Sequence, residues 1–75
     1  MRLTLFHYGP LRDHRGCAEE TIDAPVAGLR DLYAWCGFSL DPVSIAVAVN
    51  DDLTTWDRTL ADGDTVVFLP PVSGG

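Results

Sequence analysis

Apolar and polar residues alternate at the start of the chain, as they do in a β-strand with one buried face. Residues 2–8 place Leu3, Leu5 and His7 on one face of a predicted strand and leave the intervening side chains on the other. Pro10 ends this strand, because proline has no N–H to donate to a β-ladder. The first strand therefore supplies one apolar face to a core.

Four later segments also have strand patterns, and turn-forming residues separate them. Residues 11–17 are predicted to be a polar loop, after which a short strand pairs with the first as a hairpin. The segment 45–49 is apolar on both faces, which indicates a central strand. The predicted strands are residues 18–23, 45–49, 53–56 and 65–69, with turns at Asn50-Asp51-Asp52 and Asp62-Gly63-Asp64.

One segment has the periodicity of an amphipathic helix. Pro25 suits the first helical position, where its missing N–H is not needed. We predict that the helix runs from Pro25 to Cys36, and that Gly37 forms a left-handed C-terminal cap. Its apolar stripe consists of Val26, Leu29, Leu32, Tyr33 and Cys36.

The order of these elements predicts the fold. Two strands, a helix and three further strands fit one main helix packed across a mixed sheet of four or five strands, an α+β arrangement. This is the ubiquitin-like β-grasp layout, in which the first and last strands run parallel and adjacent at the sheet centre. We predict a β-grasp domain over residues 1–69 and a flexible C-terminal tail over residues 70–75. The predicted core is Leu3, Leu5, Ile22, Val26, Leu29, Leu32, Ile45, Val47, Val49, Val66 and Phe68.

The composition limits what such a small domain can do. The chain has 75 residues, a net charge of −6 and no lysine, since all five basic residues are arginine. Negative charge opposes binding to nucleic acid and to anionic membranes, and it favours basic partner surfaces. The apolar segments are too short for a signal peptide or a membrane span, so we expect a cytoplasmic protein. A core of this size leaves little room for a pocket, and elaborate chemistry is expected to belong to a partner.

The tail has the features of a segment that carries an acyl group into the active site of another protein. Pro70 and Pro71 favour a stiff, extended exit, and six extended residues reach roughly 20 Å. Gly74 and Gly75 have no Cβ and can pass through a narrow channel. The Gly75 carboxylate would need adenylation before sulfur could replace AMP to give a thiocarboxylate. The chain has no G-x-x-x-x-G-K-[ST] motif, so we expect no stably bound cofactor and assign ATP and Mg²⁺ to a partner enzyme.

Simpler interpretations apply to several of these residues. A glycine pair at a chain end is often a frayed terminus without a function. Cys17 and Cys36 are far apart and, with His7 and His14, match no zinc-binding spacing, so we predict no metal site. Cys36 lies on the helical stripe and is expected in the core, whereas Cys17 is expected to be a loop thiol.

The end of the chain resembles a known family. Asp62-Gly63-Asp64 before an apolar strand, followed by Phe68-Leu69-Pro70-Pro71-Val72-Ser73-Gly74-Gly75, is similar to the small, sulfur-carrying subunit of molybdopterin synthase. This subunit belongs to the MoaD/ThiS-like family, which also includes the thiamine-pathway sulfur carrier. The resemblance extends over the whole chain, through Leu11-Arg12-Asp13, the single helix and Val47-Ala48-Val49-Asn50.

The resemblance implies a reaction cycle that several proteins share. An E1-like adenylating enzyme would activate Gly75, and a sulfur donor protein would supply the sulfur of the thiocarboxylate. The tail would then deliver that sulfur to cyclic pyranopterin monophosphate in the large subunit of a heterotetrameric molybdopterin synthase. The chain would thus be the carrier subunit of a sulfurtransferase and not catalytic alone.

The resemblance also implies a docking face. Family members bear apolar residues on the sheet face away from the helix and use them against both partners. Strand alternation places the matching residues here at Phe6, Tyr8, Leu53 and Leu69, and the tail adds Pro70, Pro71, Val72 and Ser73.

Three departures from the family pattern leave the pathway open: Gly9-Pro10, His14-Arg15 and a short segment between the helix and the third predicted strand. A sulfur carrier for thiamine or for another sulfur-transfer pathway fits the same residues. A non-catalytic ubiquitin-like interaction or modifier protein fits the fold as well. The absence of lysine excludes chains of this protein on itself, but it does not exclude conjugation to other proteins.

Overall fold

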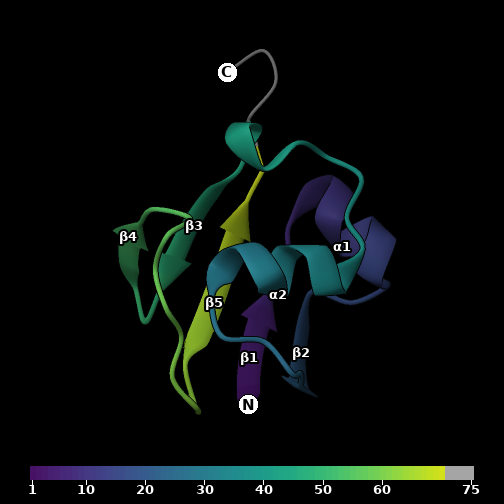
Figure 1. Cartoon of the computed structure of the whole chain (residues 1–75). Helices are drawn as coiled ribbons and strands as arrows, with labels where there is room; N and C mark the ends of the chain where they lie inside the picture. The colour runs from purple at the N-terminus through teal and green to yellow at the C-terminus, as the bar shows by residue number, and fades with distance from the viewer. Residues whose placement is uncertain (71–75) are drawn as a thin grey trace.

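The structure, a computed structural model, describes residues 1–70, which form one five-stranded sheet and two α-helices (Figure 1). The elements are β1 (Arg2–Phe6), α1 (Gly9–Arg15), β2 (Glu19–Asp23), α2 (Leu29–Cys36), the 3-10 helix η1 (Pro42–Ser44), β3 (Ala46–Val49), β4 (Asp52–Thr54) and β5 (Thr65–Leu69). Within residues 1–70, neither α-helix has the length and apolar character needed to cross a bilayer.

The sheet has the strand order β2-β1-β5-β3-β4. The central strand, β5, pairs in parallel with β1 and antiparallel with β3. The hairpin between β1 and β2 is antiparallel, as predicted. Because the first and last strands are parallel neighbours at the centre, the predicted β-grasp architecture is confirmed.

The core lies between α2 and one face of the sheet, which α2 crosses in Figure 1. Of the predicted core residues, Ile22 and Val26 are only partly buried and pack at its margin, because β2 is an edge strand and Val26 precedes the helix. Leu11 and Leu60 belong to the core although they were not predicted. The other predicted core residues are confirmed: Leu3, Leu5, Leu29, Leu32, Ile45, Val47, Val49, Val66 and Phe68.

The predicted polar loop over residues 11–17 is wrong, because most of it belongs to α1. Gly9 takes a left-handed φ of +55°, which redirects the chain after β1, and Pro10 lies in the first turn of the helix. Leu11 is 1% exposed and anchors this short helix in the core. The first strand consequently ends at Phe6, two residues earlier than predicted.

The main helix begins at Leu29 and not at Pro25, which corrects the prediction. The segment before it is held instead by the loop that precedes β5, where the Leu60 N–H donates to the Ala27 carbonyl at 2.9 Å. Such tertiary hydrogen bonds occupy backbone groups that a longer helix would have used. Gly37 has a left-handed φ of +75°, so the predicted C-terminal cap is confirmed.

The short edge strand predicted over residues 53–56 is β4, over Asp52–Thr54. Asn50 and Asp51 both take left-handed φ angles, of +52° and +71°, and join β3 to β4 by a two-residue turn. Trp56 lies beyond the strand, and its indole N–H donates to a carbonyl of η1 at 3.0 Å. Because the turn is only two residues long, β4 begins one residue earlier than predicted and ends two residues earlier.

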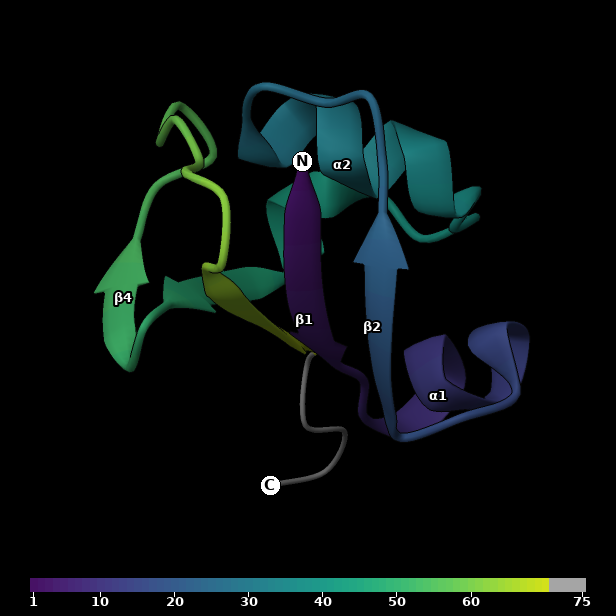
Figure 2. The same ribbon diagram turned by 90° about the horizontal axis from the view of Figure 1, so that it is seen from below.

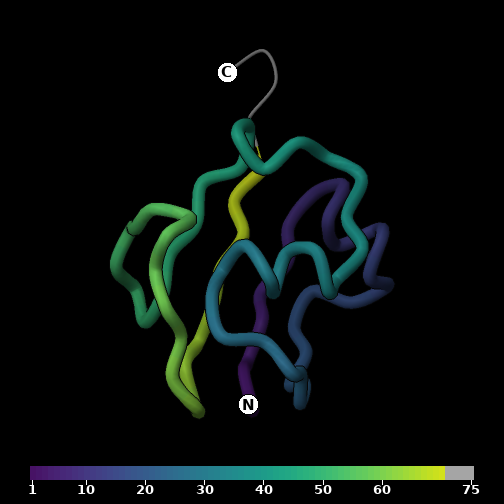
Figure 3. The backbone as a smooth tube through the Cα atoms, viewed as in Figure 1, coloured from purple at the N-terminus to yellow at the C-terminus, as the bar shows by residue number. Residues whose placement is uncertain are grey.

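The connection between α2 and β3 passes beside α1 (Figure 3). The ring of Phe38 in this connection lies 5.4 Å from that of His14 and 5.8 Å from that of Phe68. These aromatic contacts close the core near the C-terminal end of β5.

Candidate functional site

The sheet has a second face, opposite α2, that carries apolar side chains. The strand register aligns Phe6, Val67, Ala48 and Leu53 across four adjacent strands. Leu69, two residues after Val67, lies on the same face. We call these five residues the outer face. Leu53 is 74% exposed and Leu69 is 37% exposed, so part of the outer face is open to solvent.

Three of the predicted docking residues, Phe6, Leu53 and Leu69, therefore share one face, whereas Tyr8 lies outside the strand. Since β1 ends at Phe6, strand alternation no longer determines where the Tyr8 side chain lies. Tyr8 precedes α1 as its N-cap and is 48% exposed. Figure 2 shows α1 at this end of the sheet, where β1 ends and β2 begins. The role of all four residues in docking stays a prediction.

The base of the tail lies at the same end of the sheet. Because β5 runs parallel to β1, the chain leaves β5 beside the point where β1 gives way to α1. A Cβ on Gly9 would lie 3.4 Å from the Cγ of Pro70, so the Pro70 ring lies close to position 9. The remaining predicted tail residues lie outside the described residues, and their roles stay predictions: Pro71, Val72, Ser73, Gly74 and Gly75.

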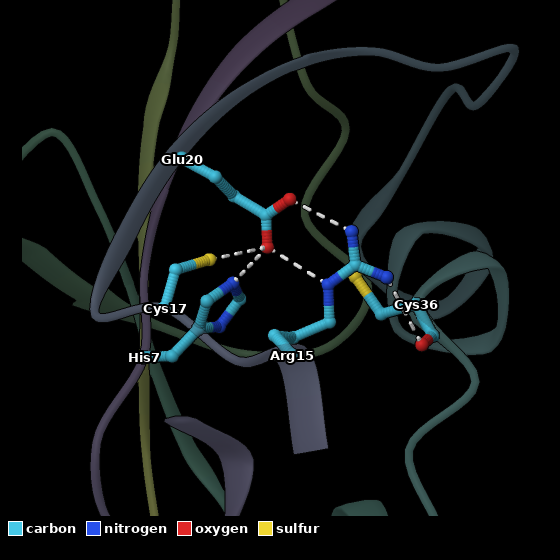
Figure 4. Close-up of polar contacts among 5 residues, drawn as sticks. All are labelled: His7, Arg15, Cys17, Glu20 and Cys36. Carbon is cyan, nitrogen blue, oxygen red and sulfur yellow. Dashed lines mark hydrogen bonds and ion pairs between the residues drawn. The ribbon is translucent and has the colours of Figure 1, made fainter. Parts of the chain in front are cut away.

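A polar cluster joins β1, α1 and β2 on the core side of the sheet (Figure 4). His7 is fully buried, and its Nε2 lies 2.7 Å from Oε2 of Glu20. Arg15 holds the same carboxylate with a forked pair of hydrogen bonds, from Nε to Oε2 at 2.8 Å and from Nη2 to Oε1 at 2.7 Å. The Cys17 thiol lies 3.6 Å from Oε2. Because an ionised carboxylate only accepts hydrogen bonds, Nε2 of His7 carries a proton.

Arg15 extends this cluster to α2. Its Nη1 donates to the Cys36 carbonyl at 3.5 Å, and its guanidinium carbon lies 5.5 Å from the Trp35 ring centroid. Among residues 1–70, Nδ1 of His7 has no hydrogen-bond partner, and no three His, Cys, Asp or Glu side chains are grouped to hold a metal ion. Through its hydrogen bonds to Glu20 and Cys36, Arg15 links α1 to β2 and α2.

The surroundings of the cluster shift the pKa values of its members. Hydrogen bonds from Arg15, with a smaller contribution from His7, lower the pKa of Glu20 to about 2 against the opposing effect of burial. Burial raises the pKa of the Cys36 thiol to about 11, and burial together with the Glu20 charge raises the pKa of Cys17. Both thiols are protonated at neutral pH and are therefore weak nucleophiles. Cys36 is 3% exposed, which confirms its predicted place in the core.

This cluster was not predicted from the sequence, although one signal for it was present. His7 alternates with Leu3 and Leu5, and a polar side chain on a core-facing position needs a buried partner. The partner is Glu20 because the hairpin register places Glu20 opposite Leu5, on the same face. That register depends on how α1 connects the two strands, which the sequence pattern did not reveal.

We expect Glu20→Gln to lower the free energy of unfolding at pH 7 by about 2–3 kcal/mol, because Arg15 and His7 lose their anion. The folded-state pKa of about 2 lies below the ordinary value of 4.5. The stabilisation by Glu20 is thus complete above pH 4.5 and is lost as the pH falls from about 4.5 to about 2. Urea denaturation of both proteins across this range measures the effect. The exposed-site control Glu19→Gln should change stability by less than about 0.5 kcal/mol, and a pH-independent loss for Glu20→Gln would contradict the assignment.

Comparisons with known proteins agree with this geometry. The model of the ThiS family matches residues 7–75. The chain is 46% identical, over 56 residues, to the molybdopterin synthase sulfur carrier subunit of Escherichia coli strain K12. That match covers 75% of this chain and 65% of the relative, so the chain spans somewhat less than two thirds of the relative's length.

Three solved structures share the fold over nearly the whole chain. The putative molybdopterin converting factor subunit 1 of Pyrococcus furiosus has a TM-score of 0.77 at 29% identity, with 96% of this chain and 99% of that chain covered. A protein–protein complex of subunits 1 and 2 of the molybdopterin-converting factor of Helicobacter pylori has a TM-score of 0.66 at 30% identity, with both chains covered completely. The thiamine biosynthesis protein of Geobacter metallireducens has a TM-score of 0.64 at 25% identity, again with complete coverage. Since the family match includes all but the first six residues, this β-grasp chain belongs to the ThiS family.

Proposed function

We propose that this chain is a sulfur carrier for molybdopterin synthesis, and thus for the molybdenum cofactor. The observation that carries the proposal is the family match through residue 75, which includes the whole predicted tail. The 46% identity to a protein named as the sulfur carrier subunit of molybdopterin synthase favours this pathway over others. The chain would deliver sulfur, and its partners would perform the chemistry.

The fold suits a carrier of this kind. The tail continues from β5, which β1 and β3 hold on its two sides at the centre of the sheet. Pro70 follows directly and restricts the backbone at the base of the tail. A rigid body with its reactive group at the end of a short tail allows partners to bind the body and to act on the terminus separately.

Two steps at Gly75 would load the sulfur. The Gly75 carboxylate attacks the α-phosphorus of ATP and displaces pyrophosphate, which gives an acyl-adenylate. Hydrosulfide sulfur, supplied by a donor protein, then attacks the acyl carbon. AMP leaves with the electron pair of the broken C–O bond, and a thiocarboxylate and a proton remain. An E1-like adenylating enzyme would bind the ATP and Mg²⁺, because this chain has no phosphate-binding loop.

The outer face is the surface that we assign to the partner proteins. The Helicobacter pylori relative was solved as a complex with a second subunit. In this chain the exposed Leu53 and Leu69 would be covered in such a complex, and the net charge of −6 favours a basic partner surface. Two copies with two large subunits would form the heterotetrameric synthase.

A second candidate is a sulfur carrier for thiamine synthesis. It is favoured by the match to the ThiS family and by the likeness to the thiamine biosynthesis protein of Geobacter metallireducens. The loading chemistry at Gly75 would be the same, and only the acceptor of the sulfur would differ. The two candidates therefore need separate tests for loading and for delivery.

We expect the chain to gain about 16 Da, the mass difference between sulfur and oxygen, when it is incubated with its adenylating enzyme, ATP, Mg²⁺ and a sulfur source. Intact-mass spectrometry measures this gain. A reaction without ATP is the control and should show no change. A modifier protein that forms isopeptides would instead appear as a covalent conjugate on another protein, and such a conjugate without any gain of about 16 Da on the free chain would refute the carrier function.

Delivery to an acceptor separates the two pathways. We expect the loaded chain to convert cyclic pyranopterin monophosphate to molybdopterin in the presence of the large synthase subunit. Mass spectrometry of the pterin products measures the transfer. Loading without transfer to the pterin, together with sulfur transfer to the thiamine thiazole precursor, would support the second candidate.

A further inference from the structure

The base of the tail lies beside a glycine at the start of α1. Because β1 and β5 are parallel neighbours, the residues that follow β1 lie beside the residues that end β5. Gly9 has a φ of +55°, and a Cβ at this position would lie 3.4 Å from Cγ of Pro70. The Pro70 ring thus borders the space that a side chain at position 9 would occupy.

Both sides of this contact are conformationally restricted. Gly9 begins α1, which is held in place by the buried Leu11 and by the ion pair between Arg15 and Glu20. The pyrrolidine ring fixes the φ angle of Pro70. Neither Gly9 nor the Pro70 ring can therefore move easily to make room for an added side chain. A side chain longer than a methyl group at position 9 would compete with the ring for the same space.

We propose that Gly9 is a positioning residue that sets the direction in which the tail leaves the body. This inference rests on the proposed carrier function and adds a requirement to it, namely that the body aims the tail as well as binding the partner. Gly9 does not touch the reacting group. A displacement of about 1 Å at a reacting atom can cost about a hundredfold in rate, so the exit direction affects catalysis by the partner.

The test compares Gly9→Asn with Gly16→Asn. Both glycines have left-handed φ angles, +55° and +77°, at opposite ends of α1, and asparagine tolerates that conformation better than most residues. A Cβ at Gly16 would meet nothing within 4 Å, so this control has similar backbone strain without a contact to the tail. With the adenylating enzyme and ATP, we expect Gly9→Asn to lower kcat about tenfold or more and to leave KM within about twofold. Gly16→Asn should keep both constants near the wild-type values, and equal kcat values for the two variants would overturn the proposal.

An NMR measurement on the unbound chain decides the proposal independently of the carrier function. We expect nuclear Overhauser contacts between the Hα protons of Gly9 and the ring protons of Pro70. Gly9→Asn, but not Gly16→Asn, should change the residual dipolar coupling of the Val72 amide relative to the body. Absence of the contacts in the wild-type chain, or equal couplings in both variants, would overturn the proposal. Failure of the wild-type chain to be adenylated would refute the carrier function, and the NMR comparison would still decide the role of Gly9.

Discussion

Removal of Gly75 is expected to abolish thiocarboxylation and to leave the stability of the fold unchanged. The shortened chain still ends in a carboxylate, now on Gly74, but its acyl carbon falls short of the reacting position by about 3.5 Å. Because a misplacement of about 1 Å already costs about a hundredfold in rate, the gain in mass should fall below detection. Intact-mass spectrometry after incubation with the adenylating enzyme, ATP, Mg²⁺ and a sulfur source measures the loss.

Two further variants make this experiment decisive. Asp31→Asn changes an exposed side chain of α2 and leaves the tail intact, so it should still be loaded. Leu11→Ala removes a buried side chain, should lower the free energy of unfolding by about 2–5 kcal/mol and shows that the urea assay detects damage to the fold. The chain without Gly75 should differ from wild type by less than about 0.5 kcal/mol in that assay. If it is still loaded at the wild-type rate, Gly75 is not the reacting residue.

Leu53→Asp is expected to weaken binding to the large synthase subunit by about a hundredfold or more, or about 3 kcal/mol. Leu53 is 74% exposed at the edge of the sheet, and the register places it beside Ala48 on the outer face. In a complex that covers this face, the new carboxylate would be buried without a partner charge. Isothermal titration calorimetry with the large subunit measures the change in affinity.

Ala34→Asp is the matched control for the added charge. Ala34 is exposed on α2, in the layer opposite the outer face, so its substitution adds the same negative charge away from the proposed interface. The affinity of this variant should stay within about twofold of wild type, because exposed charges at a distance are screened by salt. Equal losses in the two variants would show that net charge, and not the outer face, determines binding.

The sheet could be predicted from the sequence, whereas the first helix could not. β1 is predicted from alternating apolar and polar residues, which fix the face towards the core, and β5 from a short apolar run between turn-forming residues. α1 has one buried residue, Leu11, and short helices depend on tertiary packing for their stability. Its sequence accordingly looks like a polar loop until the core that receives Leu11 is known.

The sequence likewise predicted the positions of some residues of the candidate site and not of others. Phe6, Leu53 and Leu69 were placed on one face by strand alternation, and the register agrees. Strand alternation does not determine the side on which Tyr8 lies, because β1 ends at Phe6 and the conformation of Gly9 turns the chain into α1. The partner of His7 was missed because a buried polar group indicates that a partner exists but not which residue it is.

The sequence alone determined the strands, their inward and outward faces and the β-grasp order, because these follow from local periodicity and from the positions of glycine and proline. Only the tertiary structure decided where α2 begins, which carboxylate holds His7 and which backbone supports Pro70. Each of these depends on segments far apart in the chain, which meet only after β1 and β5 pair in parallel at the centre of the sheet.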